Sequence, residues 1–252
     1  MVGASSLERL LRKMKDFQRR AHPETWSSHE GGSPSFELES WLNSPTVAPR
    51  QICEIGLNTG ESAAAWLCTF PSASYLGFDL ARFNATTDAA EFLQLAFPGR
   101  FRLIAGNTFA TLPLHASTHP GTCDVFSVDG GHEFNVAYSD LSYARVLASE
   151  RSTVVMDDLR CTQWWCKPPT AVWHYFRETG LIRERGCVIA GCCTGWCWGA
   201  FNRSAAQPDA TGVCGDEKTR TQTRHGQKCV RKANLFNVSQ QELADLMAGS
   251  VS

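Results

Sequence analysis

Short apolar strands alternate with helices from about residue 50 onward, and this alternation is the strongest constraint on the fold. The strands are predicted at 51–57, 75–80, 102–105, 124–128 and 153–156, and the helices between them at 62–70, 87–97, 109–114 and 135–148. Strand–helix–strand units with right-handed crossovers build a parallel sheet that is covered by helices on both faces. The sequence therefore predicts a doubly wound, mostly parallel, Rossmann-like α/β fold.

Both flanks of this alternating region carry further predicted elements. Apolar residues at helical spacing predict an amphipathic helix at 6–20, and a short helix is expected at 36–42. After the fifth strand, a helix is predicted at 171–179, followed by strands at 187–190 and 196–201. Because a short connection joins the last two strands, we expect them to form an antiparallel edge of the sheet.

These elements divide the chain into three predicted parts. Residues 1–49 form an N-terminal helical segment and linker, residues 50–204 form the main domain, and residues 205–252 form a basic C-terminal extension. Ser239 and Glu242 make a capping box, which predicts a short final helix within this extension.

Composition excludes some classes of protein and leaves others open. With 43% hydrophobic and 19% charged residues, the 252-residue chain has the composition of a globular protein rather than a disordered one. No apolar run reaches the roughly 18 residues that a membrane-spanning helix needs. The net charge is −1, but residues 1–20 and 215–232 each hold six basic and two acidic side chains. We interpret these basic ends as solvated, so nucleic acid is not an expected partner, and contact with nucleic acid or anionic lipid is the alternative.

Cysteine usage bears on the compartment in which the chain folds. The sequence has 11 cysteines, and its first residues lack the apolar core of a signal peptide. We therefore expect thiols in a reducing, cytoplasmic compartment rather than a disulfide framework. Neither Cys161 with Cys166 nor Cys192 and Cys193 with Cys197 has the paired spacing of a structural zinc site, so zinc is not expected.

The residues that directly follow the predicted strands are the candidates for ligand binding, because sheets of this kind bind ligands beyond the carboxyl ends of their strands. The turn after the first strand holds Glu54, Gly56, Asn58, Gly60 and Ser62. It lacks the three glycines of a dinucleotide-binding motif. Its glycines allow close approach of backbone to a ligand, and the next helix offers free N–H groups to an anion. Asp79 ends the second strand, where an acid accepts hydrogen bonds from ribose hydroxyls.

A second group of polar residues follows the fourth and fifth predicted strands. Asp129 ends the fourth strand, and Asp157 and Asp158 end the fifth. Three carboxylates in one place repel one another, and a hard divalent cation such as Mg²⁺, Ca²⁺ or Mn²⁺ removes that penalty. The alternative is structural: Asp157 or Asp158 caps the next helix and Asp129 bonds a turn. His132, with an ordinary pKa near 6.5, is either a general base at neutral pH or a turn residue.

Together the two motifs resemble the class I S-adenosylmethionine-dependent methyltransferases over roughly residues 50–200. They are most similar to the methyltransferase 24 family and to the metal-dependent O-methyltransferases of the catechol and caffeoyl-coenzyme A type. The resemblance implies a cofactor site in which Glu54, Gly56, Gly60 and Ser62 surround the methionine part, Asp79 binds the ribose and Asn107 lies near the adenine. Asn58 is expected to bind the cofactor as well. The resemblance also implies that Asp129, Asp157 and Asp158 are metal ligands, with His132 at the position of the catalytic lysine of the catechol group.

From these observations we expect a cytoplasmic, S-adenosylmethionine-dependent O-methyltransferase that uses a divalent cation, most simply Mg²⁺, to methylate a hydroxyl of a small molecule. Its catalytic residues are expected to be His132 and Asp129. A metal-independent methyltransferase that acts on oxygen or nitrogen is one alternative, and a non-catalytic binding protein on the same fold is another. Trp164, Trp165 and Trp173 form either a wall for the acceptor or part of the core. The sequence leaves open whether the chain forms a homo-oligomer.

Overall fold

The computed structural model describes residues 4–22, 43–45, 47–190 and 194–205. The chain divides into two units, Met1–Arg203 and Ser204–Ser252, and every element described lies in the first. The strands are β1 (Gln51–Ile55), β2 (Ser74–Asp79), β3 (Phe101–Ala105), β4 (Cys123–Val128), β5 (Ala148–Met156), β6 (Ile182–Ala190) and β7 (Thr194–Phe201). The helices are α1 (Ala4–Ala21), α4 (Glu61–Thr69), α5 (Asn84–Ala96), α6 (Thr108–Thr118), α7 (Phe134–Leu147) and α8 (Lys167–Glu178), with a short 3₁₀ turn at Trp164–Cys166.

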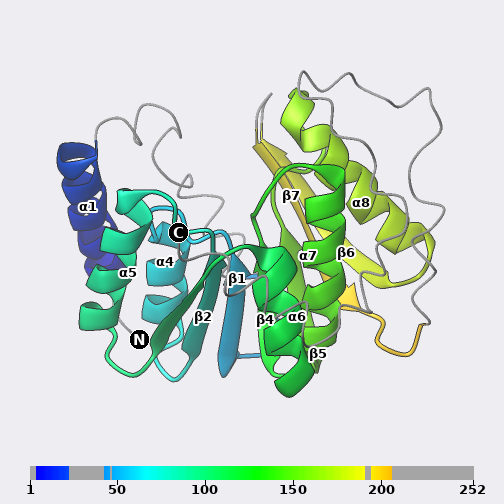
Figure 1. Cartoon of the computed structure of the whole chain (residues 1–252), viewed down its shortest axis with the longest axis horizontal. Helices are drawn as coiled ribbons and strands as arrows, with labels where there is room; N and C mark the ends of the chain where they lie inside the picture. The colour runs from blue at the N-terminus through cyan, green and yellow to red at the C-terminus, as the bar shows by residue number, and fades with distance from the viewer. Residues whose placement is uncertain (1–3, 23–42, 46, 191–193, 206–252) are drawn as a thin grey trace. The chain divides into compact units, whose positions relative to one another are not determined.

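The strands form one seven-stranded sheet in the order β3-β2-β1-β4-β5-β7-β6 (Figure 1). Strands β1 to β5 are parallel to their neighbours, whereas β7 runs antiparallel to both β5 and β6. This confirms the doubly wound, mostly parallel fold and its antiparallel edge. The chain order reverses between β1 and β4, which therefore mark the switch point where such folds bind ligands.

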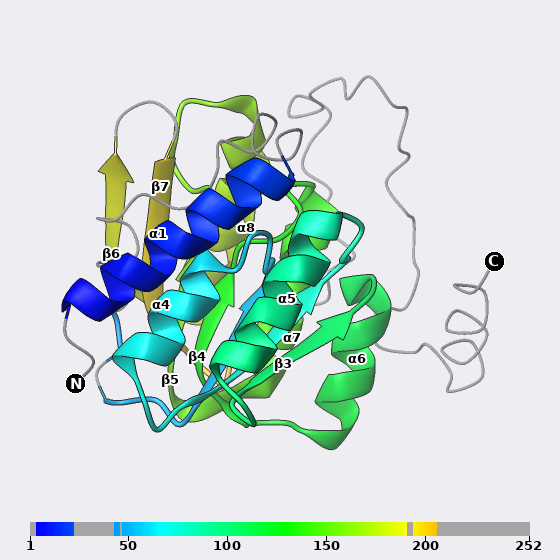
Figure 2. The same cartoon turned by 90° about the vertical axis from the view of Figure 1, so that its left-hand side faces the viewer.

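The helices lie on the two faces of the sheet in two groups. Helix α1 lies across α4 and α5 on one face (Figure 2), and α6, α7 and α8 pack side by side on the other (Figure 1). The central strands are buried on both faces, as their continuous apolar sequences predict, and Ile52, Val125 and Val155 belong to the core. Trp66 and Trp196 pack into the same core cluster.

Some predicted boundaries differ from the observed ones. Strand β5 begins at Ala148 rather than at residue 153, and a bulge interrupts its pairing with β4. Cys123 pairs with Ala148 and Val125 pairs with Thr153, so β5 has extra residues between these two pairs. Helix α6 continues to Thr118 through Pro113, past its predicted end at residue 114. The helix predicted at 36–42 and the capping box at Ser239 lie outside the described residues. No helix in the described ranges is long and apolar enough to cross a membrane.

The prediction that the cysteines are thiols is wrong for six of the described ones, which form three disulfides. The pairs are Cys53–Cys123, Cys161–Cys166 and Cys187–Cys197, and Cys68 is a buried free thiol. A count of cysteines cannot reveal pairing that the fold creates. Residues 53 and 123 are 70 apart in sequence, yet their strands are neighbours and their Cα atoms lie 5.8 Å apart. Cys187 and Cys197 are direct register partners on β6 and β7, so in this form they are not thiolate ligands for zinc.

The disulfide between β1 and β4 should contribute measurably to stability. Replacing both Cys53 and Cys123 with alanine should lower the free energy of unfolding by about 2–4 kcal/mol, because the bond closes a long loop in the unfolded chain. Urea unfolding of the oxidised protein measures this, after peptide mapping without reductant has located the bond. Cys68→Ala is the matched control, since it removes a buried thiol without removing a bond. Alkylation of Cys53 and Cys123 in the unreduced protein would contradict the pairing.

A second prediction concerns the pH dependence of stability. His115 packs edge-to-face on Phe78 and stacks on His119, and burial, with His119 and Arg102, lowers its pKa from 6.5 to about 4. The folded state therefore binds a proton less readily than the unfolded chain, and stability falls as the pH drops from about 6.5 toward 4. Urea unfolding at pH 7 and pH 5 should show a smaller loss of stability for His115→Gln than for the wild type. Equal losses in the two proteins would show that His115 is not responsible.

Candidate active site at the switch point

The loops after β1 and β4 touch each other through their backbones. Gly56 has a φ of +91°, and a Cβ atom there would lie only 1.8 Å from the carbonyl oxygen of Asp129. The amide of Asp129 donates a hydrogen bond to the carbonyl of Ile55 at 3.0 Å, which holds the two loops in register. The predicted cofactor motif and the predicted carboxylate motif are therefore parts of one site, and only glycine fits at position 56.

Asp79 fixes the shape of the loop that follows β1. Its Oδ2 accepts hydrogen bonds from the amides of Leu57 and Asn58, at 2.8 and 3.1 Å, and its Oδ1 accepts one from the amide of Ala81 at 2.7 Å. Asn58 itself adopts a positive φ of 48° within this turn. A carboxylate has about four acceptor positions, so Asp79 keeps capacity for a further donor such as a hydroxyl.

Glu54 and Ser62 bond to each other inside the protein. The Ser62 hydroxyl donates to Oε2 of Glu54 at 2.7 Å, and the hydroxyl of Tyr75 donates to the same oxygen. Burial raises the pKa of Glu54 to about 7, although these hydrogen bonds oppose the rise. Within the described structure, Oε1 of Glu54 has no hydrogen-bond partner. Sequence reasoning missed Tyr75, although a tyrosine on a buried strand needs a partner for its hydroxyl.

The other two predicted cofactor residues have clear local roles. Asn107 is the N-cap of α6, where its Oδ1 accepts a hydrogen bond from the amide of Phe109 at 3.0 Å. Gly60 precedes α4 with a φ of +79°, and a Cβ there would lie 2.9 Å from Leu93 on α5. Contact of either residue with a cofactor stays a prediction.

The three predicted metal ligands converge. One carboxylate oxygen from each of Asp129, Asp157 and Asp158 lies within 4.8 Å of the others, and all three residues are partly buried. The pKa of Asp129 is raised well above its ordinary value, first by burial and then by the charges of Asp157 and Asp158. A proton or a cation must relieve this repulsion, and an all-oxygen donor set suits a hard divalent cation. The residues present therefore fit such an ion.

The space around these carboxylates is small. It is lined by the three aspartates together with Gly130, His132 and Pro169, among others, and its volume is about 10 Å³. That is close to the least space that holds one water molecule. The cluster therefore has room for an ion rather than for an acceptor, which would have to lie at its mouth.

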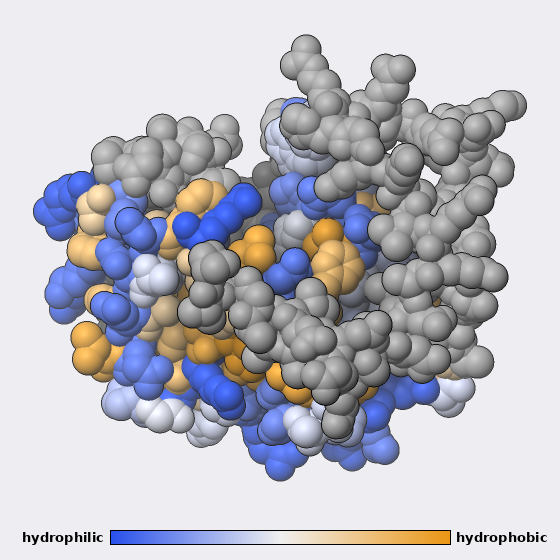
Figure 3. All heavy atoms as spheres, in the orientation of Figure 1, coloured by the Kyte–Doolittle hydropathy of each residue, from blue (hydrophilic) through white to orange (hydrophobic). Residues whose placement is uncertain are grey.

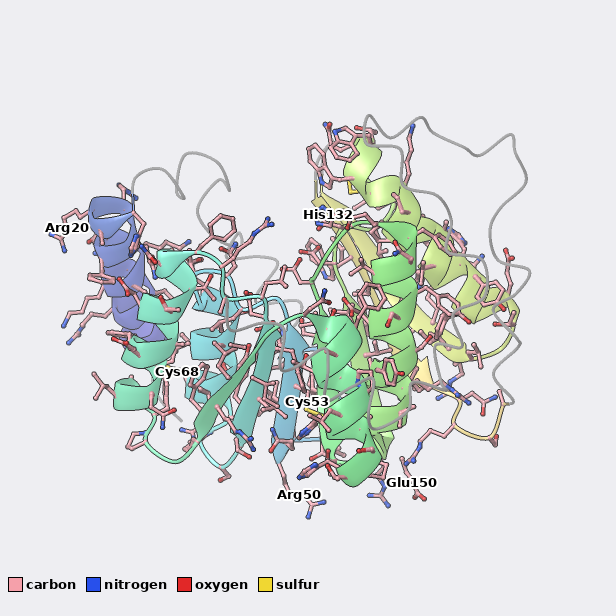
Figure 4. All side chains as sticks on the ribbon, viewed as in Figure 1. Arg20, Arg50, Cys53, Cys68, His132 and Glu150 are labelled. Carbon is pink, nitrogen blue, oxygen red and sulfur yellow. A yellow bond between two sulfur atoms is a disulfide. The ribbon has the colours of Figure 1, made fainter. Side chains whose placement is uncertain are left out.

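His132 lines the same space as the three aspartates, near the upper end of the sheet in Figure 4. Its Nε2 is 2.6 Å from Oδ2 of Asp158, and 42% of the side chain is exposed. The hydrogen bond to Asp158 raises the pKa of His132, while burial acts in the opposite direction. The structure thus holds this imidazole by one nitrogen and leaves Nδ1 as the ring atom available to another group.

Asp140 of α7 lies next to the loop between Asp129 and His132 and was not predicted as a site residue. A Cβ at Gly130 would lie 2.9 Å from its Oδ2. Burial raises the pKa of Asp140 to about 7, while Thr108 acts in the opposite direction, and neither carboxylate oxygen has a hydrogen-bond partner within the described structure. The sequence does hold a sign that Asp140 is buried. This residue lies at helical spacing from Ala137 and Ala144, so an acid occupies the apolar face of α7.

The loop after β5 brings a disulfide next to the cluster and also carries two tryptophans. The disulfide-bonded Sγ of Cys166 lies 4.0 Å from Oδ1 of Asp158. Trp164 is 73% exposed and meets Trp165 edge-to-face. Trp173 instead is fully buried and donates from Nε1 to Glu184 at 2.7 Å, so it belongs to the core and not to an acceptor wall.

Residues 53–159 match the family model of the methyltransferase 24 family, whose description is a methyltransferase domain. This segment is therefore a methyltransferase domain, and its fold is that of the class I, S-adenosylmethionine-dependent methyltransferases. The match runs from within β1 to just past β5, and so includes both loops that meet at Gly56 as well as all three aspartates of the cluster.

Solved structures share the fold of this methyltransferase domain at low sequence identity. Cofactor-bound Rv0187 from MTB superposes with a TM-score of 0.61 at 15% identity, covering 80% of this chain and 92% of that one. The O-methyltransferase TomG from Streptomyces achromogenes, solved with SAM, gives 0.61 at 14% identity, with 76% and 89% covered. An O-methyltransferase from Bacillus cereus, solved with SAH, gives 0.60 at 13% identity, with 79% and 92% covered. No curated protein matches the chain.

Because Gly56 contacts Asp129 so closely, we expect that adding a single methyl group at position 56 will weaken cofactor binding. Gly56→Ala should weaken binding of S-adenosylhomocysteine at least tenfold, because the added Cβ must push the two loops apart. Isothermal titration calorimetry measures this loss. Gly99→Ala is the matched control: Gly99 also has a positive φ, of +72°, but nothing lies within 4 Å of an added Cβ. If both variants bound the ligand equally well, the loop contact would not shape the cofactor site.

Proposed function

We propose that this protein is a divalent-metal-assisted O-methyltransferase that transfers the methyl group of S-adenosylmethionine to a hydroxyl of a small molecule. The observation that carries the proposal is the convergence of Asp129, Asp157 and Asp158 within 4.8 Å, directly beside the loop at Gly56. A methyl group on a sulfonium is already activated, so the protein has to align an acceptor oxygen and remove its proton.

The loop from Gly56 to Gly60 and the N-terminus of α4 form the proposed cofactor side of the site. Both glycines permit close approach of the backbone, and the helix N-terminus favours a carboxylate. Asp79 holds this loop and retains an acceptor position for a ribose hydroxyl. Glu54 and Ser62 act from within the protein by fixing the start of α4 to β1. Asn107, at the start of α6, is proposed to lie near the adenine.

The acceptor side consists of the carboxylate cluster and His132. The three aspartates would hold the cation, and Mg²⁺ suits their oxygen donors. When bound, a divalent cation lowers the pKa of a coordinated hydroxyl and orients it. With Nε2 of His132 engaged by Asp158, Nδ1 of the neutral ring is the atom that would accept the proton of the acceptor. Trp164 lies two residues before Cys166, whose Sγ is 4.0 Å from Asp158, and its exposed indole would offer a flat apolar surface to the acceptor.

The main alternative is a class I methyltransferase that works without metal on oxygen or nitrogen, with His132 as the base. A non-catalytic binding role on the same fold is less well supported, because nothing in the described residues specifically favours it. A possible homo-oligomer stays open, and two expectations from the sequence stay predictions: no nucleic-acid partner and a cytoplasmic location. The three disulfides weigh against the reducing compartment on which the last of these was based.

Chelation separates the two catalytic alternatives. Methyl transfer from labelled S-adenosylmethionine to a hydroxylated metabolite pool should fall roughly a hundredfold with EDTA and recover with Mg²⁺, a size typical of losing an activating group. Asp129→Asn should have a similar effect that Mg²⁺ does not reverse, because the variant removes one charged ligand. Glu178→Gln on α8 is the control and should retain activity. It removes one negative charge, as Asp129→Asn does, but from an exposed side chain. Full activity in EDTA would favour the metal-independent alternative.

A further inference from the structure

A cavity of about 660 Å³ lies at the end of the sheet opposite the carboxylate cluster. Its lining includes Glu150, near the start of β5, whereas His132 follows the end of the parallel strand β4. Figure 4 shows these two labelled residues at opposite ends of the sheet. The cavity is therefore separate from the methyl-transfer site, and its volume is in the usual range of about 300–1,000 Å³ for small-molecule pockets.

The cavity exists because β5 and β7 separate at this end. Their pairing runs only from Met156↔Cys197 to Val154↔Gly199. Beyond it, Ser152 of β5 and Phe201 of β7 both line the cavity instead of pairing with each other. The bulge in β5 falls in the same stretch, and bulges commonly redirect side chains near functional sites.

The charge of the lining is predominantly positive. Three arginines, Arg151, Arg183 and Arg185, contribute to it, against the single acid Glu150. Arg185 reaches across β7 to place Nη1 3.4 Å from the hydroxyl of Thr153 on β5. The side chains of Arg151 and Arg183 have no hydrogen bond or ion pair within the part of the chain that the structure describes. The lower edge of the molecule in Figure 3, where this end of the sheet lies, is mostly hydrophilic.

Exposed arginines on a convex surface need no ligand, but these lie around a hollow with a partly apolar floor. Ile182 and Phe201 are buried there, at 2% and 8% exposure, and Ser152 adds a hydroxyl. An apolar floor with a few convergent polar groups is typical of binding pockets. Guanidinium groups bind phosphate oxygens through paired hydrogen bonds, and three of them match a ligand with at least two negative charges.

We propose that this cavity binds a phosphorylated small molecule at a site separate from methyl transfer. Arg151 and Arg183 supply the main charge, Arg185 is held toward β5 by Thr153, and the apolar floor accepts the uncharged part of the ligand.

Calorimetric titration with inorganic pyrophosphate tests the proposal on the full chain in 150 mM salt. Wild-type protein should bind with a saturable one-to-one isotherm, and the double variant Arg151→Gln/Arg183→Gln should bind at least tenfold more weakly. Arg50→Gln is the matched control, because Arg50 lies at the same end of the sheet with 92% of its side chain exposed but outside the cavity (Figure 4). It should bind pyrophosphate like the wild type. Unchanged binding of S-adenosylhomocysteine by all variants shows that they are folded.

Three outcomes would overturn the proposal. Absence of saturable binding to the wild type would exclude a phosphate site. If Arg50→Gln weakened pyrophosphate binding as much as the double variant does, the loss would reflect only the lower net charge of the protein, an effect that salt screens. Tighter binding of citrate than of pyrophosphate would point to a carboxylate ligand instead. None of these results depends on methyl transfer, so the proposed enzymatic activity stands or falls by its own experiment.

Discussion

The close approach of two backbone loops at Gly56 and Asp129 is the constraint on which the rest of the site depends. Parallel strands β1 and β4 are neighbours, so their carboxyl ends emerge side by side. A side chain at position 56 would occupy the space of the Asp129 carbonyl, and its absence lets the loops meet. This contact places a loop suited to a nucleoside beside a group of carboxylates, and that adjacency is what a transfer reaction between two bound molecules requires.

Buried acids surround this contact on several sides. Glu54 lies in β1 just before the loop at Gly56, and Asp140 lies next to the loop that follows β4. Burial raises the pKa of each to about 7. The pKa of Asp129 is raised well above its ordinary value, because the charges of Asp157 and Asp158 add to the effect of burial. Such a concentration of acids costs stability unless protons, hydrogen bonds or cations compensate it, and compensated groups of this kind are frequent at functional sites. The electrostatics therefore supports the same location that the loop geometry indicates.

The polarity of the parallel strands separates the two candidate binding regions. One end of the sheet gathers acids, because Asp79, Asp129 and Asp157 all end or follow strands there. The opposite end gathers arginines where β5 and β7 part. The two proposed sites thus lie at opposite ends of the domain and differ in charge, one suited to cations and the other to anions.

The sequence by itself determined the order of strands and helices, the parallel sheet with its antiparallel edge, and the identity of the acids that end strands, because periodicity and strand-end position are local properties. Only the tertiary structure decided which distant residues meet: Cys53 with Cys123, Tyr75 with Glu54, Asp140 under Gly130, and the gap between β5 and β7. The prediction of thiols failed for the same reason, since composition contains no information on distance. Contacts between residues far apart in the chain depend on strand register and helix packing, and these are set by the fold as a whole.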